Sequence, residues 1–114
     1  MRAMIWEVGR KVPPDLRIFP DQAAMAAAAA AEVAARLAAP AANGSATLVL
    51  TGGRTARALY ACLAAEHAAQ VPWERLELFW GDERAVPLDD ARSNYRMARE
   101  GLLEPLAIPP ERVL

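Results

Sequence analysis

Two continuous runs of apolar residues, each of strand length, form the clearest hydrophobic pattern in the chain. The first, ATLVL, begins at Ala46 and leads into a Gly-Gly pair. The second, LELFW, begins at Leu76 and leads into Gly81 and three charged residues. Runs that are almost wholly apolar are typical of strands in a parallel sheet covered on both faces. We therefore predict buried strands over residues 46–53 and 76–80.

The long alanine-rich segment before these runs has the end signals of a helix. Asp21 is a good N-cap, and Pro40 is expected to close the segment because proline has no backbone N–H. Apolar side chains four residues apart form a narrow stripe along it: Met25, Ala29, Val33 and Leu37. We predict a helix over residues 22–39 that packs on another element along this stripe.

Two further helices are predicted, one after each strand. Thr55 can cap a helix that continues to about residue 67, and Ser93 can cap one that Pro105 ends. Strand, helix and strand in this order form a βαβ unit with parallel strands and a right-handed crossover. Both strands then end at the same edge of the sheet, which brings the Gly-Gly loop beside the charged residues.

The predicted fold class is α/β, a Rossmann-like parallel sheet with helices on both faces. At the end of the chain, IPPERVL has the pattern of a further strand. Residues 1–114 are therefore predicted to be the amino-terminal portion, or front half, of a single larger domain. Before the first helix, two short extended pieces are expected around Met4–Val8 and Leu16–Phe19, separated by two prolines.

Composition narrows the classes of function. The formal net charge of −1 gives no overall field that favours nucleic acid or an anionic membrane as partner. Alanine supplies 27 of the 114 residues, so few large side chains are available for the core. Cys62 is the single cysteine, which excludes an internal disulfide and fits a reducing compartment. With no membrane-spanning segment or signal peptide evident, the expected location is the cytoplasm.

The loops after the two strands carry the candidate chemistry. Glycines at a strand-to-helix junction let N–H groups cradle an anion with help from the helix dipole, although such glycines often serve only a tight turn. Arg84 can hold a phosphate with two hydrogen bonds, and Arg54 adds charge or points to solvent. Asp82 and Glu83 are candidates for a base, for orienting a ligand hydroxyl, or for ion pairing with Arg84. The alternative for the whole cluster is a solvated turn after a buried strand.

Three segments together resemble the 6-phosphogluconolactonase family: LVLTGGRTARALY, LELFWGDERAVPLDDARSNYRMARE and LAIPPERVL. The family pattern has a Ser/Thr-Gly-Gly-Ser-Thr-Pro loop, then Trp-Gly-Asp-Glu-Arg, then Ser-Asn-Tyr. The resemblance implies hydrolysis of 6-phosphogluconolactone to 6-phosphogluconate, with a small sugar phosphate as partner and neither metal nor organic cofactor. It also implies a set of residues around the bound sugar phosphate: Gly52, Gly53, Thr55 and Arg84, with Asp82 and Asn94 in support.

The chain departs from the family pattern at two points. Arg54 and Ala56 replace a serine and a proline in the loop, which changes its ligand contacts. The family's Asp-Gly-His segment, which carries the histidine thought to activate water, has no match, and His67 is predicted at the far end of its helix. We therefore expect a sequence truncated before its catalytic base, with little or no lactonase activity alone.

Two other functions stay open from the residues. One is a sugar-phosphate isomerase or deaminase of the glucosamine-6-phosphate deaminase type, against which the Gly-Asp-Glu-Arg segment argues. The other is a non-catalytic effector module that binds a sugar phosphate within a regulator. A helix-turn-helix would be expected ahead of such a module, and none is legible in residues 1–45.

Overall fold

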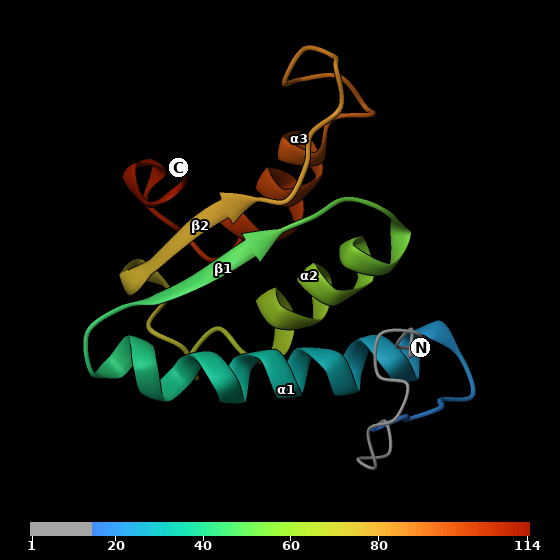
Figure 1. Cartoon of the computed structure of the whole chain (residues 1–114), viewed down its shortest axis with the longest axis vertical. Helices are drawn as coiled ribbons and strands as arrows, with labels where there is room; N and C mark the ends of the chain where they lie inside the picture. Colours follow the sequence, from blue (N-terminus) through green and yellow to red (C-terminus); the bar gives the residue numbers. More distant parts are fainter. Residues whose placement is uncertain (1–14) are drawn as a thin grey trace, which may run out of the picture.

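The computed structural model describes residues 15–114 as an α/β arrangement of helices around a small parallel sheet (Figure 1). The predicted extended piece at Met4–Val8 lies outside the described residues, and Leu16–Phe19 forms no strand. The elements in chain order are α1 (Gln22–Ala42), β1 (Ala46–Leu50), α2 (Arg54–Glu66), η2 (Trp73–Arg75), β2 (Leu76–Trp80), α3 (Asn94–Ala98), η3 (Arg99–Leu103) and η4 (Pro110–Arg112).

Strands β1 and β2 pair in parallel, as predicted, with Ala46 opposite Leu76 and Leu50 opposite Trp80. The last residues of the chain continue the sheet on the other side of β2. Val113 forms a parallel bridge with Leu78, and the next amide donates to the Leu78 carbonyl at 2.9 Å. The α/β class with a parallel sheet is therefore confirmed, and residue 113 lies where the sequence predicts a third strand.

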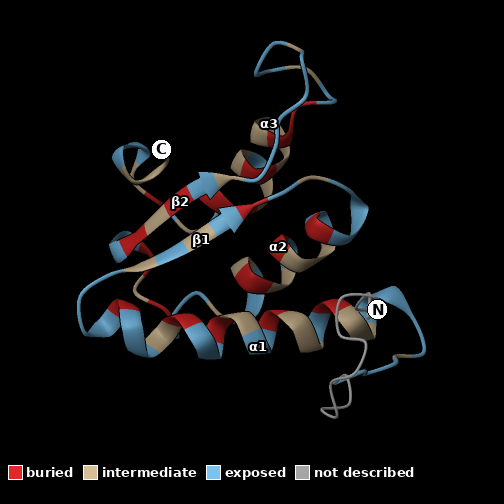
Figure 2. Ribbon diagram, viewed as in Figure 1, coloured by how far each residue is buried: buried red, intermediate tan, exposed pale blue. Residues whose placement is uncertain are grey.

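The described helices cover one face of the sheet. Leu50, Leu76 and Leu78 are buried with residues of α1, α2 and η3 in a single core. On the opposite face, Val49 is 58% exposed and Phe79 38% exposed (Figure 2). The continuous apolar runs predicted cover on both faces, and residues 15–114 provide it on one.

Helix α1 packs against α2 through small side chains. Its buried positions are Ala26, Ala30, Ala34, Leu37 and Ala41. Of the predicted stripe, Leu37 is buried, Val33 is partly buried against the core, and Met25 and Ala29 are half-buried, so the stripe lies beside the centre of the buried face. Small alanine side chains allow two helices to approach closely and still pack densely. Because most of this segment is alanine, hydrophobicity alone does not distinguish its faces.

The end of α1 also differs from the prediction. The helix runs through Pro40 and ends at Ala42, with Asn43 at the C-cap. Pro40 has no N–H and therefore removes one helical hydrogen bond. The helical pattern of hydrogen bonds resumes after it, since the Asn43 amide donates to the Ala39 carbonyl at 3.1 Å. By length and composition alone, α1 is long and apolar enough to span a membrane. It carries Glu32 and Arg36, however, and its buried Ala30, Ala34 and Ala41 belong to the core.

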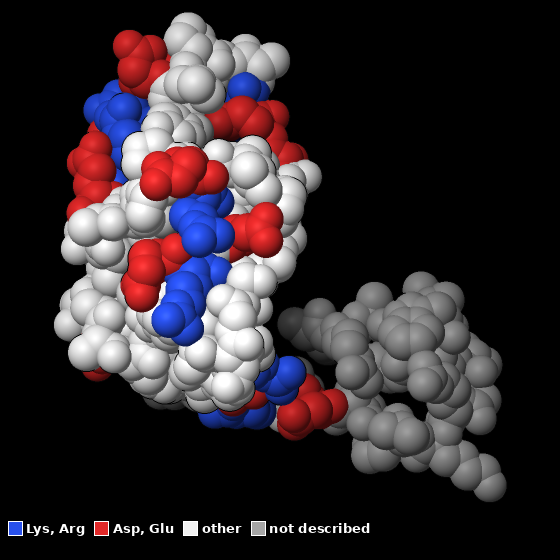
Figure 3. All heavy atoms as spheres, turned by 90° about the vertical axis from the view of Figure 1, so that its left-hand side faces the viewer, with Lys and Arg blue, Asp and Glu red and all other residues white. Residues whose placement is uncertain are grey.

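Charged residues are interspersed on the surface. On the face that Figure 3 shows, blue and red side chains alternate over short distances and form no extended patch of one sign. Several are local ion pairs between helical neighbours, such as Arg36 with Glu32 at 2.8 Å. Exposed pairs of this kind contribute little to stability, typically about 0.3–0.5 kcal/mol each.

Candidate functional site

The two loops singled out in the sequence meet at the carboxyl edge of the sheet. Because the strands are parallel and in register, the loop after β1 and the loop after β2 leave the sheet side by side. The Gly81 amide donates to the Leu50 carbonyl at 2.8 Å and extends the pairing into the loops. Gly53 and Arg84 line the same hollow, as predicted.

Gly53 forms the junction between β1 and α2. Its φ of 99° lies in the left-handed region, where glycine is favoured over other residues. It is also the N-cap of α2 and supplies no side-chain hydrogen bond, so the predicted cap at Thr55 was wrong. The Thr55 hydroxyl instead accepts a hydrogen bond from Gln22 Nε2 at 3.4 Å. The first turn of α2 thus has no capping side chain in front of its N–H groups.

Tyr60 fixes the start of this loop and was not recognised from the sequence as a site residue. Its side chain is buried, and its hydroxyl bonds to both backbone groups of Thr51: it accepts from the N–H at 2.9 Å and donates to the C=O at 2.9 Å. Burial raises the pKa of Tyr60, and the Thr51 hydrogen bond opposes that rise. A tyrosine two turns along a helix from a glycine loop is the only sequence signal for this contact.

A hollow of about 170 Å³, here called the arginine hollow, lies between the two loops and the start of α3. Four arginines belong to its lining. It is lined by Gly53, Arg54, Arg57, Arg84, Ala91, Arg92, Ser93, Asn94 and Met97.

The arginines of the hollow differ in their partners. Arg92 pairs with Asp90 through two side-chain hydrogen bonds of 3.0 Å, and these bonds lower the pKa of Asp90 to about 2. Within residues 15–114, Arg54, Arg57 and Arg84 make no ion pair with a carboxylate. Arg57 lies near enough to Glu100 to help lower the pKa of that carboxyl, whereas Arg54 and Arg84 bring positive charge to the hollow without an ion pair among the described residues. An anion of phosphate size matches that charge and geometry.

Asn94 contacts both the loop after β1 and the loop after β2. It is only 3% exposed, and its Nδ2 donates to Asp82 twice, to the backbone carbonyl at 3.2 Å and to Oδ1 at 3.1 Å. Its amide group also lies against Gly52, where an added Cβ would overlap the Asn94 side chain. Gly52 is thus needed for the packing of Asn94, in addition to any role in approaching a ligand.

Asp82 does not line the arginine hollow. It lines a separate hollow of about 400 Å³ together with Trp80, Leu88 and Tyr95. The rings of Trp80 and Tyr95 meet edge to face there, with centroids 5.8 Å apart. Of the predicted site residues, Gly53, Arg54, Arg84 and Asn94 line the arginine hollow, while Gly52, Thr55 and Asp82 do not. Their contacts with a ligand stay a prediction.

Glu83 does not pair with the Arg84 guanidinium, so ion pairing, one of the three roles considered for Asp82 and Glu83, is wrong for Glu83. Its carboxylate instead accepts hydrogen bonds from three backbone amides and one hydroxyl. Desolvation raises the pKa of Glu83, but these hydrogen bonds, the largest from the Tyr95 amide, outweigh it and lower the pKa to about 2. A carboxylate with so low a pKa is a weak base at neutral pH.

His67 also lies apart from the site. It is the C-cap of α2, at the end of the helix opposite Gly53, and its Nδ1 is 2.8 Å from Gln70 Oε1. Among residues 15–114 there is no group of three or more His, Cys, Asp or Glu side chains that could hold a metal ion. The described residues near the arginine hollow thus offer anion binding and no group recognisable as a base at neutral pH.

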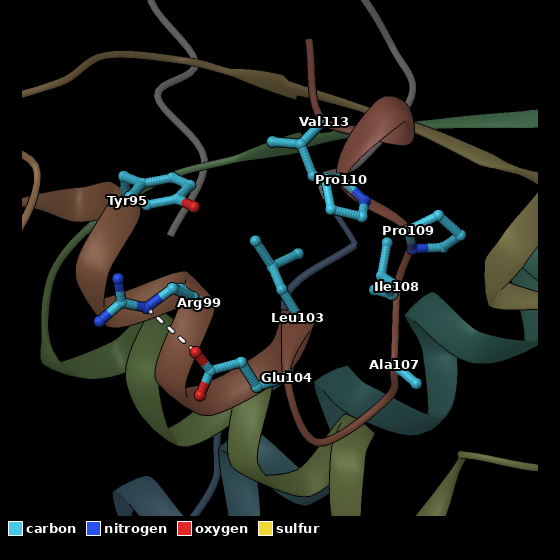
Figure 4. A pocket seen from close by; sticks show the side chains of 9 residues that line it. All are labelled: Tyr95, Arg99, Leu103, Glu104, Ala107, Ile108, Pro109, Pro110 and Val113. Carbon is cyan, nitrogen blue, oxygen red and sulfur yellow. Dashed lines mark ion pairs between the residues drawn. The ribbon is translucent and has the colours of Figure 1, made fainter.

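A larger cavity of about 480 Å³ has different chemistry (Figure 4). It lies between the helical stretch 95–104 and the segment 107–113, and most of its walls are apolar, including Leu103, Ile108 and Val113. Its two charged residues pair with each other. Arg99 Nε is 3.2 Å from Glu104 Oε1, and the two side chains point toward each other in Figure 4. Neither strand-tip loop lines this cavity, so it is not the anion site.

Comparison with known proteins gives consistent matches. Residues 20–114 match the family described as glucosamine-6-phosphate isomerases/6-phosphogluconolactonase. The chain is 42% identical over 102 residues to 6-phosphogluconolactonase of Streptomyces coelicolor, covering 88% of this chain and 39% of that protein. It is 44% identical over 99 residues to 6-phosphogluconolactonase of Mycobacterium tuberculosis, covering 86% of this chain and 40% of that protein.

Solved structures agree with the sequence matches. The structure of 6-phosphogluconolactonase from Trypanosoma cruzi superimposes with a TM-score of 0.76 at 36% identity, covering 89% of this chain and 38% of that one. The enzyme from Trypanosoma brucei gives a TM-score of 0.76 at 32% identity, covering 90% and 39%. The chain spans about 40% of the length of the curated relatives it matches.

Proposed function

Because the chain belongs to the glucosamine-6-phosphate isomerase/6-phosphogluconolactonase family, we propose that it forms the phosphate-binding part of a 6-phosphogluconolactonase. The reaction is the hydrolysis of 6-phospho-D-glucono-1,5-lactone to 6-phospho-D-gluconate, in the oxidative branch of the pentose phosphate pathway. The curated relatives named above are 6-phosphogluconolactonases, which favours lactone hydrolysis over amino-sugar isomerisation. The observation that carries the proposal is the arginine hollow beside the Gly-Gly loop.

The phosphate of the substrate binds in the arginine hollow. Arg84 follows β2 and Arg54 belongs to the first turn of α2, so the two arginines line the hollow from different loops. The N–H groups of the α2 first turn and the positive end of its dipole add to the attraction. Gly53 lets the backbone come close to the phosphate, because it carries no Cβ and its φ is positive.

The chemistry of the reaction requires a group that these residues do not supply. Water adds to the lactone carbonyl carbon, the ring C–O bond breaks, and the ring oxygen leaves as a hydroxyl while a carboxylate and a proton are formed. A base with a pKa near the working pH speeds this addition. Glu83, with its pKa near 2, and His67, at the far end of α2, are unsuited to that task. We expect this chain alone to bind the sugar phosphate and to hydrolyse the lactone slowly or not at all.

The proposal extends to partner and location. The ligand is a small sugar phosphate, and the reaction needs no metal or organic cofactor. The proposed location is the cytoplasm, which agrees with a single cysteine, Cys62, that forms no disulfide. The domain is a single α/β unit of which residues 1–114 form the amino-terminal portion.

The test is the affinity of the chain for 6-phosphogluconate, measured by calorimetric titration. Arg84→Ala removes one guanidinium group, and we expect the binding free energy to weaken by about 2 kcal/mol, which raises Kd roughly thirtyfold. The matched control is Arg36→Ala, which removes an exposed arginine of α1 that pairs with Glu32. Equal affinity of the wild type and Arg84→Ala would contradict the proposal, as would an equal loss in both variants.

A further inference from the structure

Glu83 has the most extensively hydrogen-bonded carboxylate of the described residues. One oxygen, Oε1, accepts from the Arg84 amide at 2.7 Å and from the Asn94 amide at 2.7 Å. The other, Oε2, accepts from the Tyr95 amide at 2.9 Å and from the Ser93 hydroxyl at 3.0 Å. A carboxylate has about four lone-pair sites, so four donors leave little capacity for a ligand or a water proton.

These contacts join the tip of β2 to the beginning of the next helix. The amides of Asn94 and Tyr95 belong to the first turn of α3, whose N–H groups have no partner within the helix. A negative charge at that end of a helix is favourable. Ser93 is also the N-cap and accepts from the Arg96 amide at 3.2 Å, so Glu83 and Ser93 together complete the start of α3.

The residue held in this way is the one that connects the two loops of the site. Asn94 bonds to Asp82 at 3.1 and 3.2 Å and packs on Gly52, so its position sets the spacing between the β1 loop and the β2 loop. Glu83 additionally holds the backbone amide of Arg84, whose side chain lines the arginine hollow. Through two different contacts, one carboxylate therefore holds two residues that line the hollow, Arg84 and Asn94, and through Asn94 it reaches Gly52, the neighbour of Gly53.

We propose that Glu83 is a positioning residue of the phosphate site, which acts on the ligand only through Asn94 and the backbone of Arg84. The inference rests on the proposed function, because it concerns the affinity of the same hollow for a sugar phosphate. Binding sites depend on groups held within about 0.5 Å of the productive geometry, and such preorganisation is supplied by neighbours that never touch the ligand. Glu83 has that relation to the hollow, which it does not line.

A purely structural role for Glu83 gives a different expectation. If the carboxylate only stabilises the start of α3, its removal lowers the unfolding temperature and leaves the affinity of the remaining folded molecules unchanged. A control variant that destabilises the fold elsewhere separates the two roles. Leu37→Ala is suitable, because Leu37 is buried in α1 and belongs neither to the loops nor to the arginine hollow.

The experiment measures the Kd for 6-phosphogluconate of the full chain with Glu83→Ala, Glu83→Gln and Leu37→Ala, below the unfolding transition of each. We expect Glu83→Ala to weaken binding about tenfold or more. Glu83→Gln keeps an oxygen acceptor at one position and loses the other, so we expect an intermediate Kd and a more stable fold than Glu83→Ala. Leu37→Ala should lower the unfolding temperature and keep the wild-type Kd.

A second measurement needs no ligand. The side-chain amide protons of Asn94 should exchange slowly with solvent in the wild type and faster in both Glu83 variants, as followed by nuclear magnetic resonance. Wild-type affinity in folded Glu83→Gln, or unchanged Asn94 exchange, would overturn the inference and leave the proposed function standing. Failure of the wild type to bind 6-phosphogluconate would contradict the proposed function, and the Asn94 exchange would then decide the role of Glu83.

Discussion

The contact between Gly52 and Asn94 gives the most direct structural prediction. In Gly52→Ala, the new Cβ would overlap the Asn94 side-chain amide, which is buried and hydrogen-bonded. The flexible end of an exposed side chain would move aside at little cost, but Asn94 is held by its backbone amide and by two bonds from Nδ2 to Asp82. We therefore expect the substitution to displace Asn94 and separate the two loops.

The magnitude follows from the contacts that are lost. Two hydrogen bonds contribute about 1 kcal/mol each to stability. Forcing an extra carbon into a packed region adds about 1–3 kcal/mol. We expect Gly52→Ala to lower the free energy of unfolding by about 3 kcal/mol, which is a large part of the roughly 5–15 kcal/mol typical of a small protein. The unfolding temperature should fall by at least about 10 °C.

The assay is urea unfolding followed by tryptophan fluorescence, with Gly101→Ala as the matched control. A Cβ at Gly101 would meet only Tyr60 Cβ at 3.7 Å, an ordinary contact, and Gly101 lies within the helical turn η3. Alanine is the better helix former by about 1 kcal/mol, so this control should keep or raise stability. A free energy of unfolding for Gly52→Ala that equals the wild-type value would refute the reasoning.

The remaining predictions concern stability. Tyr60→Phe removes the hydroxyl that bonds to both backbone groups of Thr51, and should cost about 1–3 kcal/mol in the same urea assay; a wild-type midpoint would contradict it. The pKa values of Glu83 and Asp90 lie at about 2, below their ordinary values of 4.5 and 3.8. Their contribution is therefore complete above those ordinary values and is lost as the pH falls towards 2. Thermal unfolding between pH 7 and 2 should show this loss, and Glu83→Gln should reduce it; an identical pH profile in that variant would exclude Glu83 as a contributor.

The parallel pairing of β1 and β2 could be predicted from the sequence, because this pairing depends on features that tertiary packing rarely overrides. Two apolar runs separated by a helix-forming segment allow few topologies, and right-handed βαβ crossovers are nearly universal. From that topology alone, the neighbouring positions of Gly53 and Arg84 follow. The cap at Ser93 was also confirmed, because its hydroxyl accepts from the Arg96 amide.

The errors arise where local rules compete with packing. Alanine is similarly apolar on every face of α1, so the buried positions Ala26, Ala30 and Ala34 depend on how closely α2 approaches. Thr55 has the chemistry of a cap, but the N-cap is Gly53, two residues earlier.

The hydrogen-bond partners of Glu83 could not be predicted from the sequence either. The side chain contacts residues ten to twelve positions away, across a loop that carries two aspartates and a proline. Charge pattern alone favoured the neighbouring arginine as its partner. Backbone amides at the start of α3 compete for the same carboxylate, and only the path of the loop determines which donors reach it.

Residue-resolved titration of the chain with 6-phosphogluconate tests the central claim most directly, since it asks whether one anion contacts both strand-tip loops. We predict that the backbone amide signals of Gly53, Arg54 and Arg84 shift together with a single Kd, while those of His67 at the far end of α2 stay unchanged. Shifts confined to one loop, or an absence of shifts at both, would contradict the account.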